Sequence, residues 1–159
     1  LDETISTWIS KIYPVHKSAK FYIFGINKSI YSSKLKFLKS KNIFFFGRVS
    51  KNKLKNIYLK STAMICLGYD ETFCLNALEA NSCGLPIITF AKTALRDYSI
   101  DNYNSLIAKN FNDLSKKINF LMFLKKKDLD KYNKNSIQHA KKFDPSLITK
   151  KWLKMIESL

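Results

Sequence analysis

Between positions 63 and 90 the chain alternates between apolar and helix-forming segments, and this order constrains the fold more than any other feature. Residues 63–67 form a short apolar run, and residues 86–90 form a second one. The segment between them contains Glu71 and Glu79 and ends at Gly84, a residue type common at helix C-termini. Short apolar runs bounded by turn residues are typical of buried strands. The order therefore predicts strand, loop, helix and strand, with Glu71 in the loop and Glu79 inside the helix.

The same alternation extends along the rest of the chain. The predicted buried strands are residues 21–25, 43–47, 64–67, 87–90 and 105–108. Ile5, Trp8, Ile9 and Ile12 have helical spacing and predict a first helix, which Pro14 ends. The residues predicted to cap helices are Asp2 or Thr4, Ser50, Asp113, and Asp144 followed by Pro145.

Three further segments complete this assignment. Residues 33–39 predict a short helix, and residues 125–127 predict a solvated lysine run between two helices. The final helix carries an apolar stripe of Ile148, Trp152, Met155 or Ile156, and Leu159.

Alternating strands and helices predict an α/β fold, a Rossmann-like doubly wound parallel sheet. A Rossmann-like half begins with a strand, whereas this chain begins with a predicted helix, so we expect the first strand to be missing from it. The 159 residues are long enough for one domain, 1–159, with 145–159 as a C-terminal helix.

The net charge is +16, from 28 basic and 12 acidic residues, and only Arg48 and Arg96 are arginines. Abundant lysine beside Asn, Ile, Tyr and Phe is the signature of an AT-rich genome. The alternative is attraction to anionic lipid or nucleic acid, although a protein that reads phosphates or bases specifically uses more arginine.

Three cysteines without paired spacing suit a reducing compartment. A hydrophobic content of 46% argues against a disordered chain.

The two glutamates fall where an open α/β sheet binds ligands, at the carboxyl ends of its strands. A helix N-terminus at that edge suits an anionic group such as a diphosphate. A carboxylate accepts hydrogen bonds only, so Glu79 suits a ribose diol with two hydroxyl protons to donate. Acidic residues eight positions apart are also common on solvent-exposed loops and helices. Gly84 and Pro86 each have a structural explanation as well, as a helix end and a strand start.

Together, these residues resemble the E-x7-E motif of the GT-B glycosyltransferases, especially the retaining family 4 (group 1) enzymes. Glu71-x-Phe73, Glu79-Ala80 and residues 83–86 all fall in register with that motif. The resemblance covers the chain end to end as a C-terminal donor-binding domain, whose last helix crosses back toward an N-terminal domain. It implies a hexosyl transfer with retained configuration from a UDP- or GDP-linked sugar, without a metal ion or other cofactor.

The resemblance also implies partners and a location. The acceptor would bind an N-terminal domain of the same protein, so this chain alone would be inactive. The product would be a surface polysaccharide, a lipopolysaccharide or a glycolipid. The protein would be cytoplasmic and would bind no nucleic acid. The net charge of +16 adds the expectation that it lies at the inner face of an anionic membrane.

Carried over residue by residue, the resemblance makes Glu71 the catalytic carboxylate at the donor sugar and Glu79 the ribose ligand. The remaining implied donor-binding residues are Phe73 and Cys74 at the sugar, Leu75 and Asn76 at the diphosphate, and Arg48 and Val49 beside the base.

The sequence departs from the family at three places, one of which is Asn104-Ser105, where Asn-Gly is common. Thr72 and Cys74 replace the glycines of the usual Glu-Gly-Phe-Gly loop, and residues 93–97 replace a Gly-Gly-x-x-Glu segment. Cys74 thus adds a side chain where the backbone should approach the sugar closely.

Two alternatives are a GT-B-fold sugar-nucleotide epimerase and a basic nucleic-acid-binding or scaffold domain without catalysis. The second would use Tyr22, Phe44 and Phe45 as stacking residues. Their apolar strand runs predict a core position instead.

Overall fold

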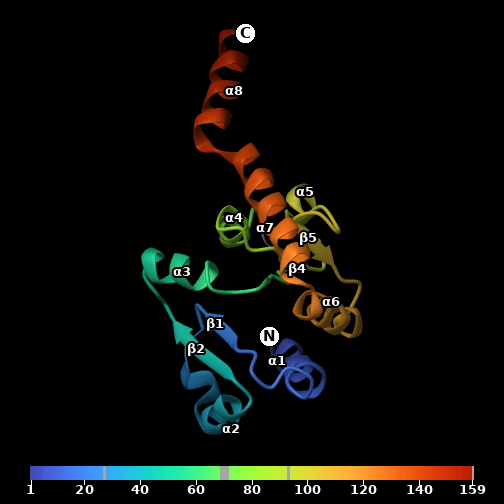
Figure 1. Cartoon of the computed structure of the whole chain (residues 1–159). Helices are drawn as coiled ribbons and strands as arrows, with labels where there is room; N and C mark the ends of the chain where they lie inside the picture. Colours follow the sequence, from blue (N-terminus) through green and yellow to red (C-terminus); the bar gives the residue numbers. More distant parts are fainter. Residues whose placement is uncertain (27, 69–71, 93, 159) are drawn as a thin grey trace.

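Five short parallel strands and the helices around them make up the part of the chain that the computed structural model describes, residues 1–26, 28–68, 72–92 and 94–158 (Figure 1). The strands are β1 (Phe21–Phe24), β2 (Ile43–Gly47), β3 (Met64–Ile65), β4 (Ile87–Thr89) and β5 (Ser105–Ile107). The α-helices are α1 (Asp2–Thr7), α2 (Leu35–Ser40), α3 (Lys51–Tyr58), α4 (Leu75–Ser82), α5 (Leu95–Tyr98), α6 (Phe111–Phe123), α7 (Lys126–Ala140) and α8 (Pro145–Glu157). A π-helical turn η1 (Trp8–Ile12) and the 3₁₀ segments η2 (Lys28–Lys34) and η3 (Lys141–Phe143) complete the order. The predicted α/β class is confirmed.

The strands form two separate parallel sheets. One sheet pairs β1 with β2, and the other has the order β3-β4-β5. In the first sheet Tyr22 lies opposite Phe44, and in the second Ile65 lies opposite Ile88. Among the described residues, β1 and β3 are therefore each paired along one edge only.

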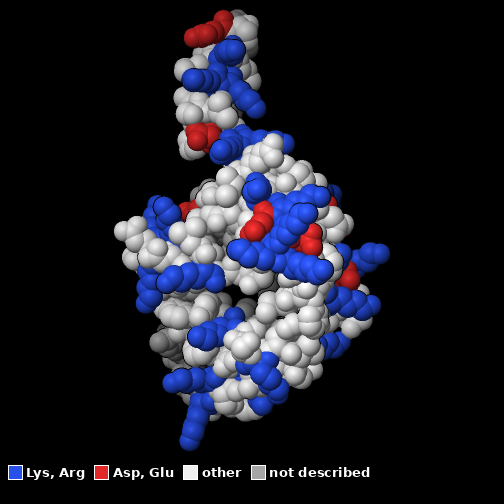
Figure 2. Space-filling model, viewed as in Figure 1, with Lys and Arg blue, Asp and Glu red and all other residues white. Residues whose placement is uncertain are grey.

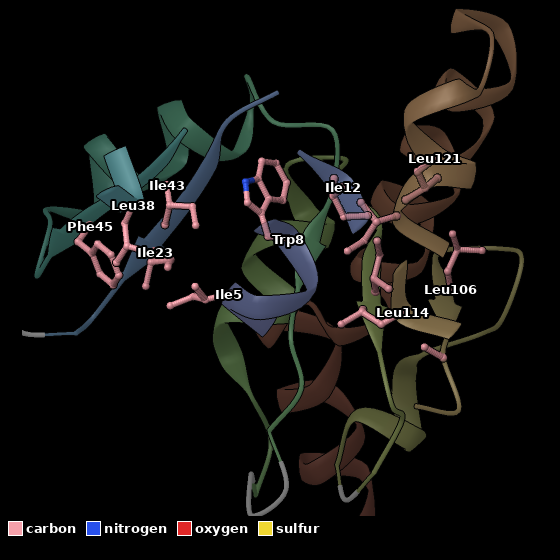
Figure 3. Close-up of a cluster of buried hydrophobic side chains, with 13 residues drawn as sticks. Ile5, Trp8, Ile12, Ile23, Leu38, Ile43, Phe45, Leu106, Leu114 and Leu121 are labelled. Carbon is pink, nitrogen blue, oxygen red and sulfur yellow. The ribbon is translucent and has the colours of Figure 1, made fainter. Parts of the chain in front are cut away.

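The first helix joins the two sheets through the main hydrophobic core. Figure 3 shows Ile5, Trp8 and Ile12 between residues of the two-stranded sheet and α2 on one side and residues of β5 and α6 on the other. The labelled residues on the two sides are Ile23, Leu38, Ile43 and Phe45, and Leu106, Leu114 and Leu121. Nε1 of Trp8 also donates to the carbonyl of Lys41, just before β2 (2.9 Å). The buried apolar surface thus makes one structural unit of the two sheets.

Two of the predicted helix starts are confirmed. The Ser50 side chain accepts the N–H of Lys53 at the start of α3 (3.4 Å). Asp144 accepts the N–H of Ser146 (2.8 Å), and Pro145 is the first residue of α8. At each start a short polar side chain precedes the helix. Ser50 has extended backbone and Asp144 is followed by proline, so the local sequence was sufficient to predict where both helices begin.

The other predicted caps are wrong. Helix α1 begins after Leu1, without a side-chain cap. Helix α6 is capped by Asn110, which accepts the N–H of Asp113 (2.9 Å), while the Asp113 carboxylate accepts the N–H of Lys109 (3.0 Å). In such reciprocal capping either polar residue fits the sequence pattern, and only geometry distinguishes them.

The predicted lysine run between helices is also wrong in part. Lys125 precedes α7, but Lys126 and Lys127 form its first turn. Lysine is a good helix former when its ammonium stays in water. Nζ of Lys126 also lies 3.8 Å from Oδ1 of Asp130, one turn later. Because this ion pair is exposed, it contributes little to the stability of the fold.

Helix α8 extends away from the rest of the molecule (Figure 1). None of its residues is buried, and its large apolar side chains Trp152, Leu153, Met155 and Ile156 are exposed. Ile148, the first residue of the predicted stripe, is half-buried, whereas the later residues of the stripe do not pack on this chain, and Leu159 lies outside the described residues. Within the described ranges, no helix has both the length and the apolar character needed to cross a membrane.

His139, in α7, is a buried titratable group. Its ring packs on those of Tyr103 and Phe143 (centroids 6.4 and 5.6 Å apart). Burial, and then the Lys142 ammonium, hold the pKa of His139 below its ordinary value of 6.5, against a smaller contribution from the main chain of Tyr98. The folded state thus favours the neutral ring.

We expect His139 to make stability depend on pH. Because its pKa is lower in the folded than in the unfolded protein, the unfolded chain takes up the proton first as pH falls below about 6.5, and stability declines. His139→Phe keeps a ring but removes this titration, so its urea midpoint should change less between pH 7.5 and pH 5 than that of the parent protein. Parallel curves for the two proteins would contradict the assignment.

Candidate functional site

The segment after β3 leads to helix α4 at the carboxyl edge of the three-stranded sheet, as the sequence predicts. The sulfur of Cys66, just beyond β3, lies 3.2 Å from the sulfur of Cys74, just before α4. Glu71, the predicted catalytic carboxylate, lies outside the described residues, so its role stays a prediction.

The turn into α4 is left-handed at Cys74, with φ 55° and ψ 61°. A residue with a Cβ adopts this conformation at a cost of about 1–2 kcal/mol, which glycine avoids. The hydroxyl of Tyr98 holds the turn by donating to the carbonyl of Cys74 (2.9 Å). The Cys74 side chain is buried beside Ala77 and Ile87. The side chain that replaces the family's glycine is therefore in the core and does not lie over the outer surface of the turn.

Phe73 precedes this turn and is 40% exposed. Its ring packs on Tyr98 and Phe143 (centroids 5.8 and 6.2 Å apart). Sequence reasoning missed Tyr98, which supports both Phe73 and Cys74. The available signal was its helical spacing from the apolar Leu95, which places it on the buried face of α5.

The first turn of α4 presents backbone N–H groups at the same edge. The amides of Ala77 and Leu78 bond to the carbonyl of Cys74 (3.0 and 3.5 Å). Helix geometry leaves the amides before them without an intrahelical acceptor, and these belong to Leu75 and Asn76, both exposed. Two of the predicted diphosphate-binding residues thus lie where an anion can reach their amides.

Glu79 lies one turn further along α4, exposed, on the wall of a groove of about 430 Å³. The opposite wall is α3, which contributes Lys51, Lys55 and Tyr58. The Tyr58 hydroxyl is 3.5 Å from the carbonyl of Asn76, to which it donates. Burial first, and then the charge of Glu79, raise the pKa of Tyr58 to about 12, so the phenol keeps its proton at neutral pH.

Arg48 and Val49 lie between β2 and α3, at the end of α3 that carries Lys51. Arg48 is exposed and Val49 half-buried. The structure therefore brings Glu79 and the start of α3 to one groove, whereas Phe73 and Cys74 lie at the other end of α4. Lys51, Lys55 and Tyr58 belong to this groove but were missed, because nothing in their local sequence separates them from an ordinary helix face.

Two buried asparagines fix the far end of α4, and sequence reasoning assigned neither a role. Nδ2 of Asn104 donates to Oδ1 of Asn81 (2.7 Å) and to the carbonyl of Tyr98 (2.9 Å). Asn81 in turn donates to the carbonyl of Leu85 (2.9 Å). The helical spacing of Asn81 from Ala77, which is also fully buried, was a usable signal.

Gly84 ends α4 as predicted. It has φ +81°, the N–H of Leu85 reaches the carbonyl of Ala80 (2.9 Å), and the N–H of Gly84 reaches that of Asn81 (2.9 Å). This is the Schellman arrangement. A Cβ on Gly84 would come within 3.3 Å of the Ile137 side chain of α7, so the position also permits close helix packing.

The loop after β4 lies at the same edge of the sheet. Ala91 there has φ +47°, a left-handed conformation, in a region where the resemblance leads one to expect glycines. Arg96 and Asp97 are exposed on α5, and Thr93 lies outside the described residues.

The residues proposed for the nucleic-acid alternative lie in the β1–β2 sheet. Phe45 is buried, and Tyr22 and Phe44 are half-buried with their rings 5.9 Å apart. The predicted core position is confirmed for Phe45.

Comparison with known proteins assigns the family. The glycosyl transferases group 1 family matches residues 8–142. The N,N'-diacetylbacillosaminyl-diphospho-undecaprenol alpha-1,3-N-acetylgalactosaminyltransferase of Campylobacter jejuni is 28% identical over 125 residues, which are 77% of this chain and 32% of that protein.

Two solved structures have a similar fold. A mutant of S. aureus TarM, in complex with fondaparinux, alpha-GlcNAc-glycerol and UDP, superposes with a TM-score of 0.81 at 19% identity, over 96% of this chain and 32% of TarM. The pneumococcal O-GlcNAc transferase GtfA, in complex with UDP and GlcNAc, gives 0.77 at 18% identity, over 99% of this chain and 33% of GtfA.

This chain spans about a third of the length of these proteins. The family match begins in η1 and ends in η3, so it contains all five strands described above and the groove between α3 and α4. The predicted Rossmann-like GT-B fold is confirmed by these neighbours, and the chain belongs to the glycosyl transferases of group 1.

Proposed function

We propose that this chain is the nucleotide-sugar-binding domain of a retaining glycosyltransferase. The observation that carries the proposal is the groove in which the Glu79 carboxylate faces helix α3. An exposed carboxylate beside a protonated tyrosine and two lysines is suited to accept hydroxyl protons from a ribose while cations balance its charge.

The three parts of the donor would occupy neighbouring stretches of the site. The ribose binds Glu79, with the base beside the backbone of Arg48 and Val49. The diphosphate lies at the start of α4, against the amides of Leu75 and Asn76. The sugar then extends toward Phe73 and Cys74.

Within this arrangement, Glu71 is the carboxylate proposed to act at the sugar. Transfer is proposed to retain the configuration of the sugar. The protein would stabilise the leaving diphosphate electrostatically, without a metal ion.

The similar proteins support a nucleotide-sugar substrate. UDP is bound in the TarM and GtfA complexes, and the Campylobacter relative is named for transfer of N-acetylgalactosamine to a diphospho-undecaprenol-linked sugar. A third similar structure, WaaG, is involved in lipopolysaccharide biosynthesis (TM-score 0.73, 16% identity, 90% of this chain). We therefore propose a hexosyl donor linked to UDP or GDP, and a surface polysaccharide, lipopolysaccharide or glycolipid as product.

The acceptor is proposed to bind an N-terminal domain of the same protein, and α8 is proposed to cross back toward that domain. The exposed apolar side chains of α8 support this, because such a face on an isolated helix is normally covered by a partner. Basic side chains cover much of the visible face, including α8 (Figure 2). They support attachment to an anionic membrane surface, and we propose that the protein is cytoplasmic.

Glu79→Gln tests the site directly. The substitution keeps the shape of the side chain but removes the charge that accepts the ribose protons, and hydrogen bonds to a charged group contribute about 1.5–3 kcal/mol. Calorimetry should show UDP or GDP binding weakened roughly ten- to a hundredfold. Glu157→Gln, which removes the same charge from exposed α8, should bind like the parent protein.

Two further comparisons complete the experiment. Glu71→Gln should leave binding of the nucleoside diphosphate unchanged, since its proposed contact is the sugar. A single-stranded oligonucleotide titrated at the same salt concentration should bind more weakly than the nucleotide. Unchanged nucleotide affinity in a folded Glu79→Gln protein would refute the proposed donor site.

A further inference from the structure

Two cysteines that are eight positions apart in the sequence meet at the carboxyl edge of the three-stranded sheet. Sγ of Cys66 lies 3.2 Å from Sγ of Cys74, and both side chains are thiols in this structure. The sequence shows no paired spacing that predicts this contact. Because a disulfide bond is about 2.05 Å long, the two sulfurs are only about 1 Å from bonding distance.

Backbone hydrogen bonds hold both cysteines in place. The N–H of Cys66 bonds to the carbonyl of Ile88 in β4 (2.9 Å), which fixes this residue to the sheet. The carbonyl of Cys74 accepts the N–H of Ala77 (3.0 Å) and the hydroxyl of Tyr98 (2.9 Å). Two anchored segments of backbone therefore bring the sulfurs together, and reactants held in this way behave as if they were highly concentrated.

The two thiols differ in their access to solvent. Cys74 is 8% exposed and packs beside Ala77 and Ile87, whereas Cys66 is half-buried at the side of the same cluster. A small oxidant therefore reaches the sulfur of Cys66 first, while the sulfur of Cys74 is shielded from it. An accessible thiol with a second thiol in contact is the arrangement of redox-sensing cysteines.

We propose that Cys66 and Cys74 form a reversible modification site, a dithiol that hydrogen peroxide converts to an intramolecular disulfide. In the first step the sulfur of Cys66 attacks the peroxide, the O–O bond breaks, and a sulfenic acid and one water are formed. The sulfur of Cys74 then attacks that of Cys66, the S–O bond breaks, and a second water leaves. Two thiols and one peroxide thus give one disulfide and two waters.

Reduction returns the site to its starting state. A glutathione thiolate attacks the more accessible sulfur, that of Cys66, and forms a mixed disulfide as Cys74 leaves as a thiolate. A second glutathione attacks the mixed disulfide, releases Cys66 and leaves as glutathione disulfide. In a reducing compartment the dithiol is therefore the ordinary form, and cytosolic disulfides are usually transient and redox-sensing.

The consequence for activity rests on the proposed donor site. Cys74 lies between Phe73, proposed to lie at the sugar, and Leu75 and Asn76, whose amides are proposed to bind the diphosphate. Because Cys66 is fixed in the sheet, forming the disulfide draws this turn toward β3 by about 1 Å. A misplacement of that size can lower a rate about a hundredfold. Oxidation should therefore inhibit transfer, and a thiol should restore it.

Cys83 is the internal control. It lies just beyond the other end of α4, half-buried in a separate cluster with Tyr58 and Leu85. Because it packs in a different cluster from the pair, it should not enter the disulfide.

Peptide mapping of the full-length protein tests the chemistry without any nucleotide. Trypsin leaves all three cysteines on residues 61–92, whereas additional cleavage after Glu71 and Glu79 places each cysteine on its own peptide. After brief treatment with hydrogen peroxide, the peptide of Cys66 should be linked to that of Cys74 by a bond that dithiothreitol removes. This link should exceed any link to the third cysteine by at least about tenfold. Absence of the link, or equal links to all three cysteines, would overturn the proposal.

Activity measurements test the effect on transfer. Peroxide followed by catalase should lower the transfer rate of the full-length enzyme at least about tenfold, and dithiothreitol should restore it. Cys66→Ala should stay active after the same treatment, whereas Cys83→Ala should be inhibited like the parent enzyme.

The two measurements separate the modification site from the proposed function. A disulfide that forms without loss of activity would overturn the effect on transfer, while the donor site keeps its own test in Glu79→Gln. If the enzyme transfers no sugar before oxidation, the proposed function fails, whereas the peptide map still decides whether the modification site exists.

Discussion

Separated from the rest of its protein, the 159-residue chain is expected to transfer no sugar to an acceptor. In the proposed mechanism the acceptor binds a different domain, and chemistry requires both reactants to be held in one geometry. That positioning contributes about 7–11 kcal/mol in well-oriented reactions, equivalent to roughly 10⁵- to 10⁸-fold in rate. Transfer and donor hydrolysis should be assayed with UDP- and GDP-sugars, in parallel with the full-length enzyme.

Nucleotide binding is the matched control for this prediction. If the isolated chain binds UDP or GDP and Glu79→Gln weakens that binding, the site is intact and the missing activity reflects the missing reactant. Turnover comparable to that of the full-length protein would show that the acceptor site lies within these 159 residues.

Asn104→Leu is expected to destabilise the fold by about 3–5 kcal/mol. The change removes the acceptor of the Ile100 N–H (2.8 Å) and the donor to Asn81 and to Tyr98. Each buried polar group left without a partner costs about 1–3 kcal/mol. For a chain of this size the melting temperature should fall by roughly 6–20 °C. Urea unfolding followed by circular dichroism should show a lower midpoint with an unchanged slope.

A double-mutant cycle separates this network from a general effect of packing. Asn81→Leu combined with Asn104→Leu should cost less than the sum of the two single changes, because both single changes remove the same bond between the two amides. Asn56→Leu, on the exposed face of α3, should shift the midpoint little. Additive single effects would show that the two asparagines are not energetically coupled.

The parts of the fold that depend on local sequence were predictable. Apolar runs located all five strands, and Ser50, Asp144 and Pro145 located two helix starts. Four of the five predicted strands are longer than those observed, as for β3, because pairing ends a strand and an apolar run does not reveal its partner. Asp113 illustrates a second limit, since reciprocal capping makes two neighbouring residues equivalent in sequence.

The parts that depend on distant contacts were not predictable. The support of Cys74 by Tyr98 spans 24 positions, and the bond between Asn81 and Asn104 spans 23. No local pattern encodes such a pairing. The groove between α3 and α4 likewise depends on how two helices pack. Its Glu79 was found from the motif, whereas Lys51 and Tyr58 could be found only in three dimensions.

The left-handed turn at Cys74 restricts the evolutionary routes open to this loop. A mutation to glycine would relieve a backbone cost of about 1–2 kcal/mol, yet it would leave a void beside Cys66 and Ile87. The gain and the loss are of similar size, so a change at position 74 is accepted most easily when position 66 enlarges to fill the space. The two sites should therefore drift as a pair, and descendants with glycine at 74 should carry a bulkier residue than cysteine at 66.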